Sequence, residues 1–551
     1  MCELPKKETL TVEFKSDRGK GYSDEGLVDE IVGMTNTEGG TLYLGIEDDG
    51  RVSGIVKHHQ DPIGLAALIA NRTRPSLSVR TEILYSDDLP VMAISIPKSY
   101  SVIATVSGKI LKRRLKVDGS PEVIPMYPYE IYTRLSDLRK LDFSAQPIQD
   151  GTVEDLDPNQ LIRLRETIQN QNGDQQLLAL SDEELEQALR LTMRVGEVVY
   201  PTLTGLLLVG KESSLKRLIP TASAVFQVMQ GTRVVMNESF TKPIMELVDL
   251  FSSYMKAWNP EKEFDYGMFR IPIPEFSRPA FREGLINALA HRDYSMMGSV
   301  RIQVSDEGLT ISNPGGFIEG ITLENLLTAE PCGRNPLLSD ALKRIGLAER
   351  TGRGIDRIFE GSITFGRPWP DYSESTAKQV TLFIPRAKAD TEFIQMVMDE
   401  QKSIGHPLAI NTLLILSVLY SERKVSEHDL AERIHISLTR LKPLIETLIE
   451  RGVVEEIGRT SQRVLMLGQK VYRKTGKSKE YTRQRGIDQV RFPEMILKLA
   501  ESQNGAVTKT DVAELLHVSK PKAYELLQQL CEERQLVLTG RGRYAKYELS
   551  K

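Results

Sequence analysis

The spacing of apolar and polar positions changes several times along this chain of 551 residues, and each change marks a new kind of element. Near the N-terminus the two classes alternate over residues 11–15, follow helical spacing over 27–35 and return to a strand in TLYLGIEDD. Strand patterns at 80–85 and 89–97 and the basic run KILKRRLK follow. These patterns predict a compact α/β module that ends at about residue 140.

The middle of the chain mixes both kinds of pattern. Two helical patterns between residues 158 and 193 precede the apolar runs TLTGLLLVG and TASAVFQVM, which we interpret as buried strands. A helix over 242–256, the helical segment REGLINALAHRDY, the strand pair SVRIQVSDEGLTISNPGG, the short helix NPLLSDALKRIG and the strand VTLFIP come next. Helices interleaved with strands in this order predict a two-layer α/β sandwich within residues 141–392, with its core at about 275–385.

Two similar units follow in tandem, each with the pattern of three helices and a hairpin. We expect a winged helix at residues 393–468 and a second at 490–551. Between them residues 469–489 include KVYRKTGKSKEYTRQR, which has seven Lys or Arg against one Glu and is typical of a linker or a basic arm. The predicted fold class is therefore multidomain α/β (α+β).

Composition narrows the protein class. Hydrophobic residues make up 40% of the chain and charged residues 26%, and no apolar run approaches the roughly 20 residues of a membrane span. No secretory signal pattern is visible, and Cys2, Cys332 and Cys531 stand singly, which favours a reducing compartment. We expect a cytoplasmic protein without membrane contact. Because the net charge is −4, any binding of nucleic acid must be local.

The two tandem units carry candidate DNA-binding residues. A helix-turn-helix places the first residues of its second helix at the base edges of the major groove, and wing cations neutralise phosphates. In the second tandem segment, residues 490–551, Ser519 is a plausible N-cap with Pro521 in the first turn. The candidates there are Ser519, Lys520, Lys522, Tyr524, Arg541, Arg543 and Lys546. In the first tandem segment, residues 393–468, they are Thr439, Arg440 and Lys442. The alternative is that one or both units mediate protein contacts.

A second set of residues suggests nucleotide chemistry. Glu283 and Asn287 are four residues apart on a predicted helix and therefore share one face, although this spacing alone is common. Three glycine-containing segments follow in order: Asn313-Pro-Gly-Gly316, Gly333-Arg-Asn335 and Thr351-Gly-Arg-Gly-Ile355. This ordered set resembles the gyrase, heat-shock chaperone, histidine kinase and mismatch-repair (GHKL) ATPase superfamily, in particular its divergent branch in bacterial transcriptional regulators.

The resemblance implies ATP and Mg²⁺ as ligands. It makes Glu283 the residue that activates water and Asn287 the Mg²⁺ ligand. The adenine-binding turn of that superfamily has an Asp, and here Asn313 stands in its place with Gly315 and Gly316 behind it, so the base would meet an uncharged acceptor. The resemblance further implies phosphate contacts from Arg334, Asn335, Gly352, Arg353 and Gly354, where a helix begins.

Two other nucleotide-related motifs are excluded. His291-Arg292-Asp293 spells the catalytic tripeptide of protein kinases, but Gly298 stands where the kinase Asn belongs and no Gly-rich loop with its strand lysine precedes it. The chain also has no G-x-x-x-x-G-K-[ST] run, so the sequence does not support a P-loop motor or helicase.

The N-terminal segments ETLTVEFK and NTEGGTLYLGIEDDG resemble the divergent Alba-like module of Schlafen proteins over residues 8–130. The resemblance implies nucleic-acid binding, with Arg113 and Arg114 in a basic patch. In some Schlafen relatives acidic residues form a ribonuclease site, which here would be Glu8, Glu13 and Asp48 around a divalent metal. We favour the plainer interpretation, in which Glu13 pairs with Lys15 and Asp48 belongs to a hairpin turn.

The leading hypothesis is an ATP-responsive transcriptional regulator that binds duplex DNA, with RNA as a secondary partner. We expect a homodimer, because helix-turn-helix proteins commonly match two-fold operators. The competing hypothesis is a metal-dependent nuclease of Schlafen type, gated by nucleotide and acting in phage defence or stress. A third possibility is a regulator whose nucleotide pocket is vestigial.

Overall fold

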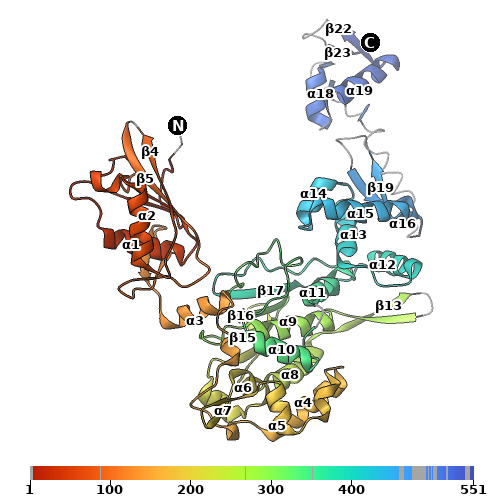
Figure 1. Ribbon diagram of the computed structural model, residues 1–551. Helices are drawn as coiled ribbons and strands as arrows, with labels where there is room; N and C mark the ends of the chain where they lie inside the picture. The colour runs from red at the N-terminus through yellow and green to blue at the C-terminus, as the bar shows by residue number, and fades with distance from the viewer. Residues whose placement is uncertain are drawn as a thin grey trace. The chain divides into compact units, whose positions relative to one another are not determined.

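The computed structural model describes residues 4–550 except 87, 267–268, 350–351, 458–463, 475–491, 494–495, 498, 501–504, 517–518 and 540–545 (Figure 1). The chain forms two compact units. The first comprises Met1–Lys262, Ile273–Gly361 and Pro368–Ala387, and the second comprises Glu263–Pro272, Ser362–Arg367 and Lys388–Lys551. Helices and strands are mixed within both, which confirms the predicted multidomain α/β class.

The first unit begins with a four-stranded sheet in the order β1-β2-β5-β4. Strands β1 and β2 are parallel and α1 connects them, whereas the other neighbours are antiparallel. Apolar side chains of α1, α2 and the sheet form one core. The elements of this module are β1 (Val12–Lys15), α1 (Asp24–Thr35), β2 (Gly40–Leu44), η1 (Lys57–His59), α2 (Pro62–Arg72), β3 (Thr73–Arg74), β4 (Arg80–Ser86), β5 (Leu89–Ile96), β6 (Ala104–Thr105), β7 (Leu111–Leu115) and β8 (Pro121–Pro125).

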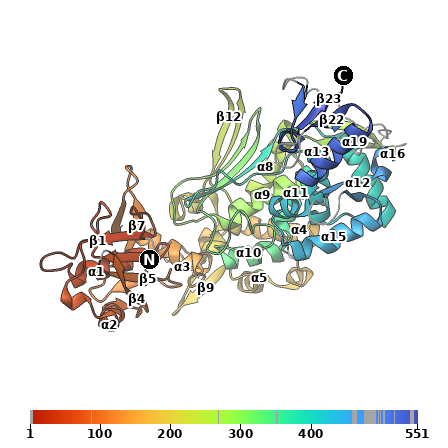
Figure 2. The same cartoon turned by 90° about the horizontal axis from the view of Figure 1, so that it is seen from above.

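The central part of the first unit contains a five-stranded sheet in the order β12-β11-β15-β16-β17. Strand β12 lies at one edge, as Figure 2 shows. The elements from the end of the first module to the end of this sheet are α3 (Pro128–Asp137), α4 (Pro158–Asn170), α5 (Asp182–Ala188), β9 (Thr192–Val195), β10 (Val198–Pro201), α6 (Leu203–Val209), α7 (Glu212–Leu218), β11 (Ala224–Gln230), β12 (Arg233–Phe240), α8 (Ile244–Trp258), β13 (Glu261–Tyr266), β14 (Phe269–Pro274), α9 (Arg278–His291), β15 (Val300–Val304), β16 (Gly308–Pro314), α10 (Pro336–Arg344), α11 (Gly354–Ile363) and β17 (Gln379–Pro385).

One face of this sheet carries helices α8 and α9. A single row of cross-strand neighbours runs Phe226–Ile302–Ile311–Leu382. The ring of Phe251 in α8 lies 5.6 Å from the ring of Phe226. Gly284 of α9 lies so close that a Cβ there would be 3.0 Å from a side-chain carbon of both Ile311 and Leu382. The absence of a side chain at this position lets α9 lie directly on the sheet.

One predicted strand is a helix. The run TLTGLLLVG forms α6, where Thr202 is the N-cap and its side chain accepts a hydrogen bond from the Gly205 amide. Every residue of α6 is buried. A run that is apolar on all sides shows neither helical nor strand periodicity, so the prediction was wrong here. The neighbouring run TASAVFQVM does contain a strand, β11, as predicted.

The second unit repeats one arrangement of elements. In each repeat, short helices are followed by a hairpin, and a short preceding strand completes a three-stranded sheet in the orders β18-β20-β19 and β21-β23-β22. The elements are α12 (Thr391–Ile404), α13 (Ile410–Glu422), β18 (Val425–Ser426), α14 (Glu427–Arg433), α15 (Leu438–Glu450), β19 (Val454–Ile457), β20 (Val464–Leu467) and α16 (Gln469–Lys474), then β21 (Ala506–Val507), α18 (Lys509–Leu516), α19 (Lys520–Glu532), β22 (Leu536–Thr539) and β23 (Lys546–Leu549).

The predicted boundaries at 140, 392, 468 and 489 stay predictions, and most of the basic linker lies outside the described residues. Within the described ranges, no helix is both long enough and apolar enough to cross a bilayer.

Candidate nucleotide and nucleic-acid sites

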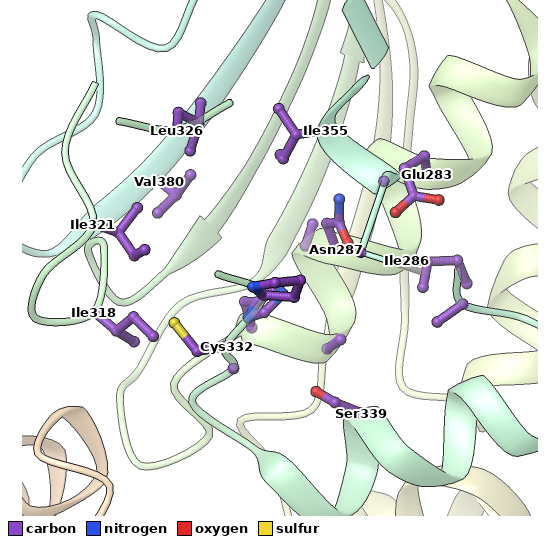
Figure 3. A pocket seen from close by; sticks show the side chains of 18 of the residues that line it. Glu283, Ile286, Asn287, Ile318, Ile321, Leu326, Cys332, Ser339, Ile355 and Val380 are labelled. Atoms are coloured by element: carbon purple, nitrogen blue, oxygen red, sulfur yellow. The ribbon is translucent and has the colours of Figure 1, made fainter. Parts of the chain in front are cut away.

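A cavity of about 490 Å³ lies in the first unit beside α9 (Figure 3). Its walls come from α9, the strands β16 and β17, the segment between β16 and α10, helix α10 and the start of α11. The size suits a small organic ligand, since such pockets span roughly 300–1,000 Å³. The predicted residues that line it are Glu283, Asn287, Asn313, Gly316, Gly352 and Gly354.

Helix α9 presents Glu283 and Asn287 to this cavity from consecutive turns. The helix begins at an N-cap, Ser277, whose hydroxyl accepts from the Ala280 amide. Burial raises the pKa of Glu283, the charge of Arg357 lowers it, and the net shift is upward. A buried carboxyl with a raised pKa is a candidate for proton transfer.

The opposite wall of the cavity is apolar. Figure 3 shows Ile318, Ile321 and Val380 on the far side of the cavity from Glu283 and Asn287. Val380 belongs to β17, and the two isoleucines belong to the segment that follows β16. The cavity therefore has one polar wall, suited to charged groups, and one apolar wall, suited to a flat ring.

The turn after β16 brings Asn313 and Gly316 to the cavity. Asn313 is buried, and its Nδ2 donates to the Pro314 carbonyl at 3.1 Å. A Cβ at Gly316 would lie 2.6 Å from the Ala377 carbonyl oxygen, so only glycine fits against the turn that leads into β17. Gly315 does not appear among the described lining residues; its amide donates to the Lys378 carbonyl at 2.8 Å.

Two glycines form the wall at the start of α11. Gly352 has φ +79°, a conformation that favours glycine, and a side chain there would overlap Pro331. Gly354 is the first residue of α11, and a side chain there would overlap the carboxylate of Glu283. The first turn of α11 therefore lies beside Glu283, with its backbone amides close to the polar wall.

Three residues that the sequence assigned to the phosphates have other contacts. Arg334 is buried and pairs with Asp137 at 2.6 Å while donating to the Gly316 carbonyl. Asn335 is buried and donates from Nδ2 to two carbonyl oxygens at the end of α9. Arg353 is largely exposed and lies near Asp356. None of the three appears among the described residues that line the cavity. Arg334 and Asn335 instead form buried hydrogen bonds to the backbone of neighbouring segments.

Sequence reasoning missed a cation and a histidine in the cavity. Lys343 and Ser339 of α10 line it, as does His291 at the end of α9. Burial lowers the pKa of His291 to about 4, and the charges of Arg334 and Lys343 act in the same direction. The four-residue spacing of Ser339 and Lys343 places them on one helix face and was the available signal.

The three predicted nuclease carboxylates lie in one part of the N-terminal module, where burial raises the pKa of Glu8 and the charges of Glu13 and Asp48 act in the same direction. Glu13 is buried and forms ion pairs with Lys15 and with Arg113, which is also buried. Glu8 accepts from the Phe14 amide at 3.1 Å, and Asp48 is exposed. Among the described residues, these three carboxylates do not meet at a distance that would hold one ion. The Glu13–Lys15 pairing that we favoured is present.

The basic patch of the N-terminal module is largely neutralised. Arg113 was expected to hold phosphate, but its side chain is 1% exposed and donates to the carbonyls of Thr9 and Val12. Arg114 remains partly exposed and donates to Glu122 at 2.6 Å. Two neighbouring lysines also have carboxylate partners: Lys109 pairs with Glu25 and Asp29, and Lys112 pairs with Glu130.

The first residues of α19 face solvent. Ser519 caps this helix, and its hydroxyl accepts from the Lys522 amide. Lys520 and Tyr524 are exposed, and Lys522 reaches Glu525 at 2.9 Å. Lys509 lies over the Tyr524 ring, a contact that sequence reasoning missed. Lys546 is exposed, whereas Arg541 and Arg543 lie outside the described residues. In the first repeat the corresponding residues Thr439, Arg440 and Lys442 are all exposed.

Comparisons with known families match three segments of the chain. Residues 8–118 match the family described as "Schlafen, AlbA_2", and residues 298–384 match "Putative ATP-dependent DNA helicase recG C-terminal". Residues 133–224 match a domain of unknown function, DUF8451. The second match spans β15 to β17 and so includes the Asn313 turn and the start of α11. The chain therefore combines a nucleic-acid-related Schlafen module with an ATPase-type domain.

Comparison with curated proteins found no match. A solved structure, the DIP2311 protein from Corynebacterium diphtheriae, is similar at 22% identity and a TM-score of 0.48, covering 98% of this chain and 95% of that chain.

We expect Glu13→Gln to lower the free energy of unfolding of the N-terminal module by about 3 kcal/mol, because it removes the nearer carboxylate of the buried Arg113 and leaves only Glu30, 4.0 Å away. Unfolding in denaturant, monitored by hydrogen exchange of backbone amides in α1 and β1, measures this free energy. The control is Asp48→Asn, an exposed change of the same chemistry that should stay within about 0.5 kcal/mol. Equal stability of the two variants would contradict the structural role of Glu13.

His291 predicts a pH dependence of stability. Its folded-state pKa of about 4 lies below its ordinary value of 6.5, so between these values the unfolded chain binds the extra proton. The free energy of unfolding of the first unit should therefore decrease as the pH falls from 6.5 towards 4. Because other groups titrate in this range, the measurement compares chemical denaturation of the protein with that of His291→Gln. A variant whose stability falls just as steeply would rule out this contribution.

Proposed function

We propose that this protein is an ATP-responsive DNA-binding transcriptional regulator. The observation that carries the proposal is the cavity beside α9, in which a Glu and an Asn on one helix face an apolar wall next to the first turn of α11. The Schlafen match and the exposed cations of the second unit supply the nucleic-acid side of the proposal.

The two walls suggest how a nucleotide binds. The base lies against Ile318, Ile321 and Val380, with Asn313 as its hydrogen-bond partner. The phosphates lie at the first turn of α11, where backbone amides and the helix dipole favour negative charge. Helix α10 brings Lys343 to the same cavity.

The residues of the polar wall fit Mg²⁺ and water. The side-chain oxygen of Asn287 is a ligand that Mg²⁺ accepts beside nucleotide phosphates, and the ion supplies positive charge at those phosphates. Glu283, with its raised pKa, orients a water molecule and accepts its proton. The close approach of Gly354 to Glu283 keeps this carboxylate next to the phosphate position.

We propose that the two repeats of the second unit are winged helices that bind duplex DNA. Each has short helices followed by a hairpin, and the exposed residues near the start of α15 and α19 include Thr439, Arg440, Lys442, Lys520 and Tyr524. In such modules the second helix lies in the major groove and its first turn reaches the base edges.

Chain connectivity suggests how nucleotide binding is coupled to DNA binding. Helix α11 starts at the cavity, and the residues at and just beyond its end, Ser362–Arg367, belong to the second unit. There the Asp390 amide at the start of α12 donates to the Phe365 carbonyl at 2.9 Å. A nucleotide that changes the start of α11 therefore acts on a helix continuous with the DNA-binding unit. The proposal includes a homodimer on a two-fold operator and a cytoplasmic location.

We expect Asn287→Ala to weaken binding of ATP with Mg²⁺ by at least about 10-fold, because it removes a metal ligand. Glu283→Gln should keep the affinity within a few-fold and lose hydrolysis, because the amide cannot accept a proton. Isothermal titration calorimetry measures the first effect and phosphate release the second. Asn159→Ala, an exposed change of the same type, is the control. Absence of binding heat from the folded wild-type protein would refute the nucleotide assignment.

We expect Lys520→Glu together with Lys522→Glu to weaken duplex binding at low salt and to reduce the steepness of its salt dependence, by roughly 0.9 in the logarithmic slope for each lost phosphate contact. Fluorescence anisotropy with a labelled duplex across a salt series measures both. The double variant Lys402→Glu with Lys388→Glu makes the same charge change away from the proposed helices. If the α19 variant binds duplex DNA with unchanged affinity, or if both double variants lose the same affinity, α19 is not the helix that contacts DNA.

A further inference from the structure

A buried histidine in the N-terminal module is held in one orientation by a buried carboxylate. His59 and Asp17 are each 1% exposed, and Nδ1 of His59 lies 2.8 Å from Oδ1 of Asp17. Backbone amides of Tyr22 and Val56 donate to the two oxygens of Asp17 at 2.6 and 2.8 Å. The carboxylate is therefore immobile, and it fixes both the orientation and the tautomer of the His59 ring.

The other nitrogen of this histidine has no hydrogen-bond partner among the described residues. Nε2 of His59 is buried, and Oδ1 of Asp24 lies 3.7 Å from it, beyond hydrogen-bond distance. A buried ring nitrogen left without a partner is costly, so its presence calls for an explanation.

Two further residues with metal-ligating groups, Asp24 and His58, lie beside the His59 ring. Asp24 is the first residue of α1, and His58 belongs with His59 to the turn η1. One donor atom from each of Asp24, His58 and His59 lies within 4.8 Å of the others. The His58 ring packs closely on Gly21, where a Cβ would lie 2.9 Å from its Cε1. The His58 ring also lies 3.9 Å, centroid to centroid, from the His59 ring, although residue 58 is exposed.

We propose that Asp24, His58 and His59 bind a divalent transition metal ion, with Zn²⁺ as the expected occupant. Two imidazoles and one carboxylate form a donor set that suits Zn²⁺, and three protein ligands leave the fourth tetrahedral position to water. Asp17 is the positioning residue, since it holds Nδ1 of His59 and leaves Nε2 for the metal. Binding requires the three donor atoms, which lie within 4.8 Å of one another, to move to metal-bond distance.

The metal joins two parts of the module that are far apart in the sequence. Asp24 starts α1, the helix that crosses between the parallel strands β1 and β2, whereas the histidines precede α2. An ion at this point clamps the turn η1 to the first turn of α1. This site is independent of the nucleotide cavity and of the proposed DNA-binding helices.

A second group of donors must be separated from this one. His428, Asp429 and Glu432 also lie within 4.8 Å of one another, but all three are exposed on α14. In the described residues no buried unpartnered nitrogen accompanies that group. The experiment therefore uses the full-length protein carrying His428→Ala, which removes this second group, and purifies it without a histidine tag. This protein is the parent of all further variants.

The test is titration of the metal-free parent protein with Co²⁺, followed by competition with Zn²⁺. We expect one Co²⁺ per chain, with the visible absorption of a tetrahedral N- and O-ligated ion, and displacement of that absorption by Zn²⁺. His58→Ala should weaken binding by at least 10-fold. Asp17→Asn should weaken it by roughly 10- to 100-fold, as loss of a partner behind a ligating histidine does.

The controls keep the outcome decisive. His406→Ala removes an exposed histidine of the second unit and should leave the stoichiometry and affinity unchanged. Thermal unfolding in chelator, where His58→Ala should match the parent, excludes misfolding as the cause. With Zn²⁺ the parent should gain stability in the N-terminal module, and His58→Ala should not. No bound Co²⁺ in the parent, or equal binding by the parent and His58→Ala, would overturn the proposal.

Discussion

The close packing of α9 on the central sheet is the constraint on which the cavity beside α9 depends. Gly284 lies against Ile311 and Leu382, and those two residues are neighbours in the row that crosses the sheet. Glu283 and Asn287 come immediately before and three residues after this contact, so their positions relative to β16 follow from the core itself. Moving α9 outward by the width of a methyl group would separate these side chains from Asn313 and open a void in the core.

The residues of this cavity differ in how far the sequence could predict them. Glu283, Asn287, Gly352 and Gly354 were predicted from the ordered set of motifs that resembles the GHKL superfamily, because the four-residue helical spacing alone is common. The role of Arg334 was not, since it depends on Asp137, nearly two hundred residues earlier in the chain. From the sequence, Lys343 was only one cation on an amphipathic helix. Which way that helix face points depends on how the helix packs in the fold, and local spacing does not determine this.

The same distinction explains the fold and the N-terminal module. Strands with alternating patterns and helices with apolar stripes were predicted close to their observed bounds. The uniformly apolar α6 shows neither helical nor strand periodicity, so the sequence pattern did not identify it as a helix. Arg113 looked like a surface cation because its partner, Glu13, lies on a different strand. The kinase-like tripeptide also has a structural use: Arg292 is buried and donates to the carbonyls of Asp293, Met296 and Gly298.

The two walls of the cavity come from different kinds of structural element. The polar wall belongs to a helix that fills the core, whereas Ile318, Ile321 and Leu326 belong to the segment between β16 and α10, which has no helix or strand of its own. Substitutions in a connecting segment disturb few packing contacts and are tolerated more readily. Sequence change in the isoleucine-bearing segment can therefore alter the shape of the apolar wall, whereas Glu283 and Asn287 lie on a helix whose position the core fixes.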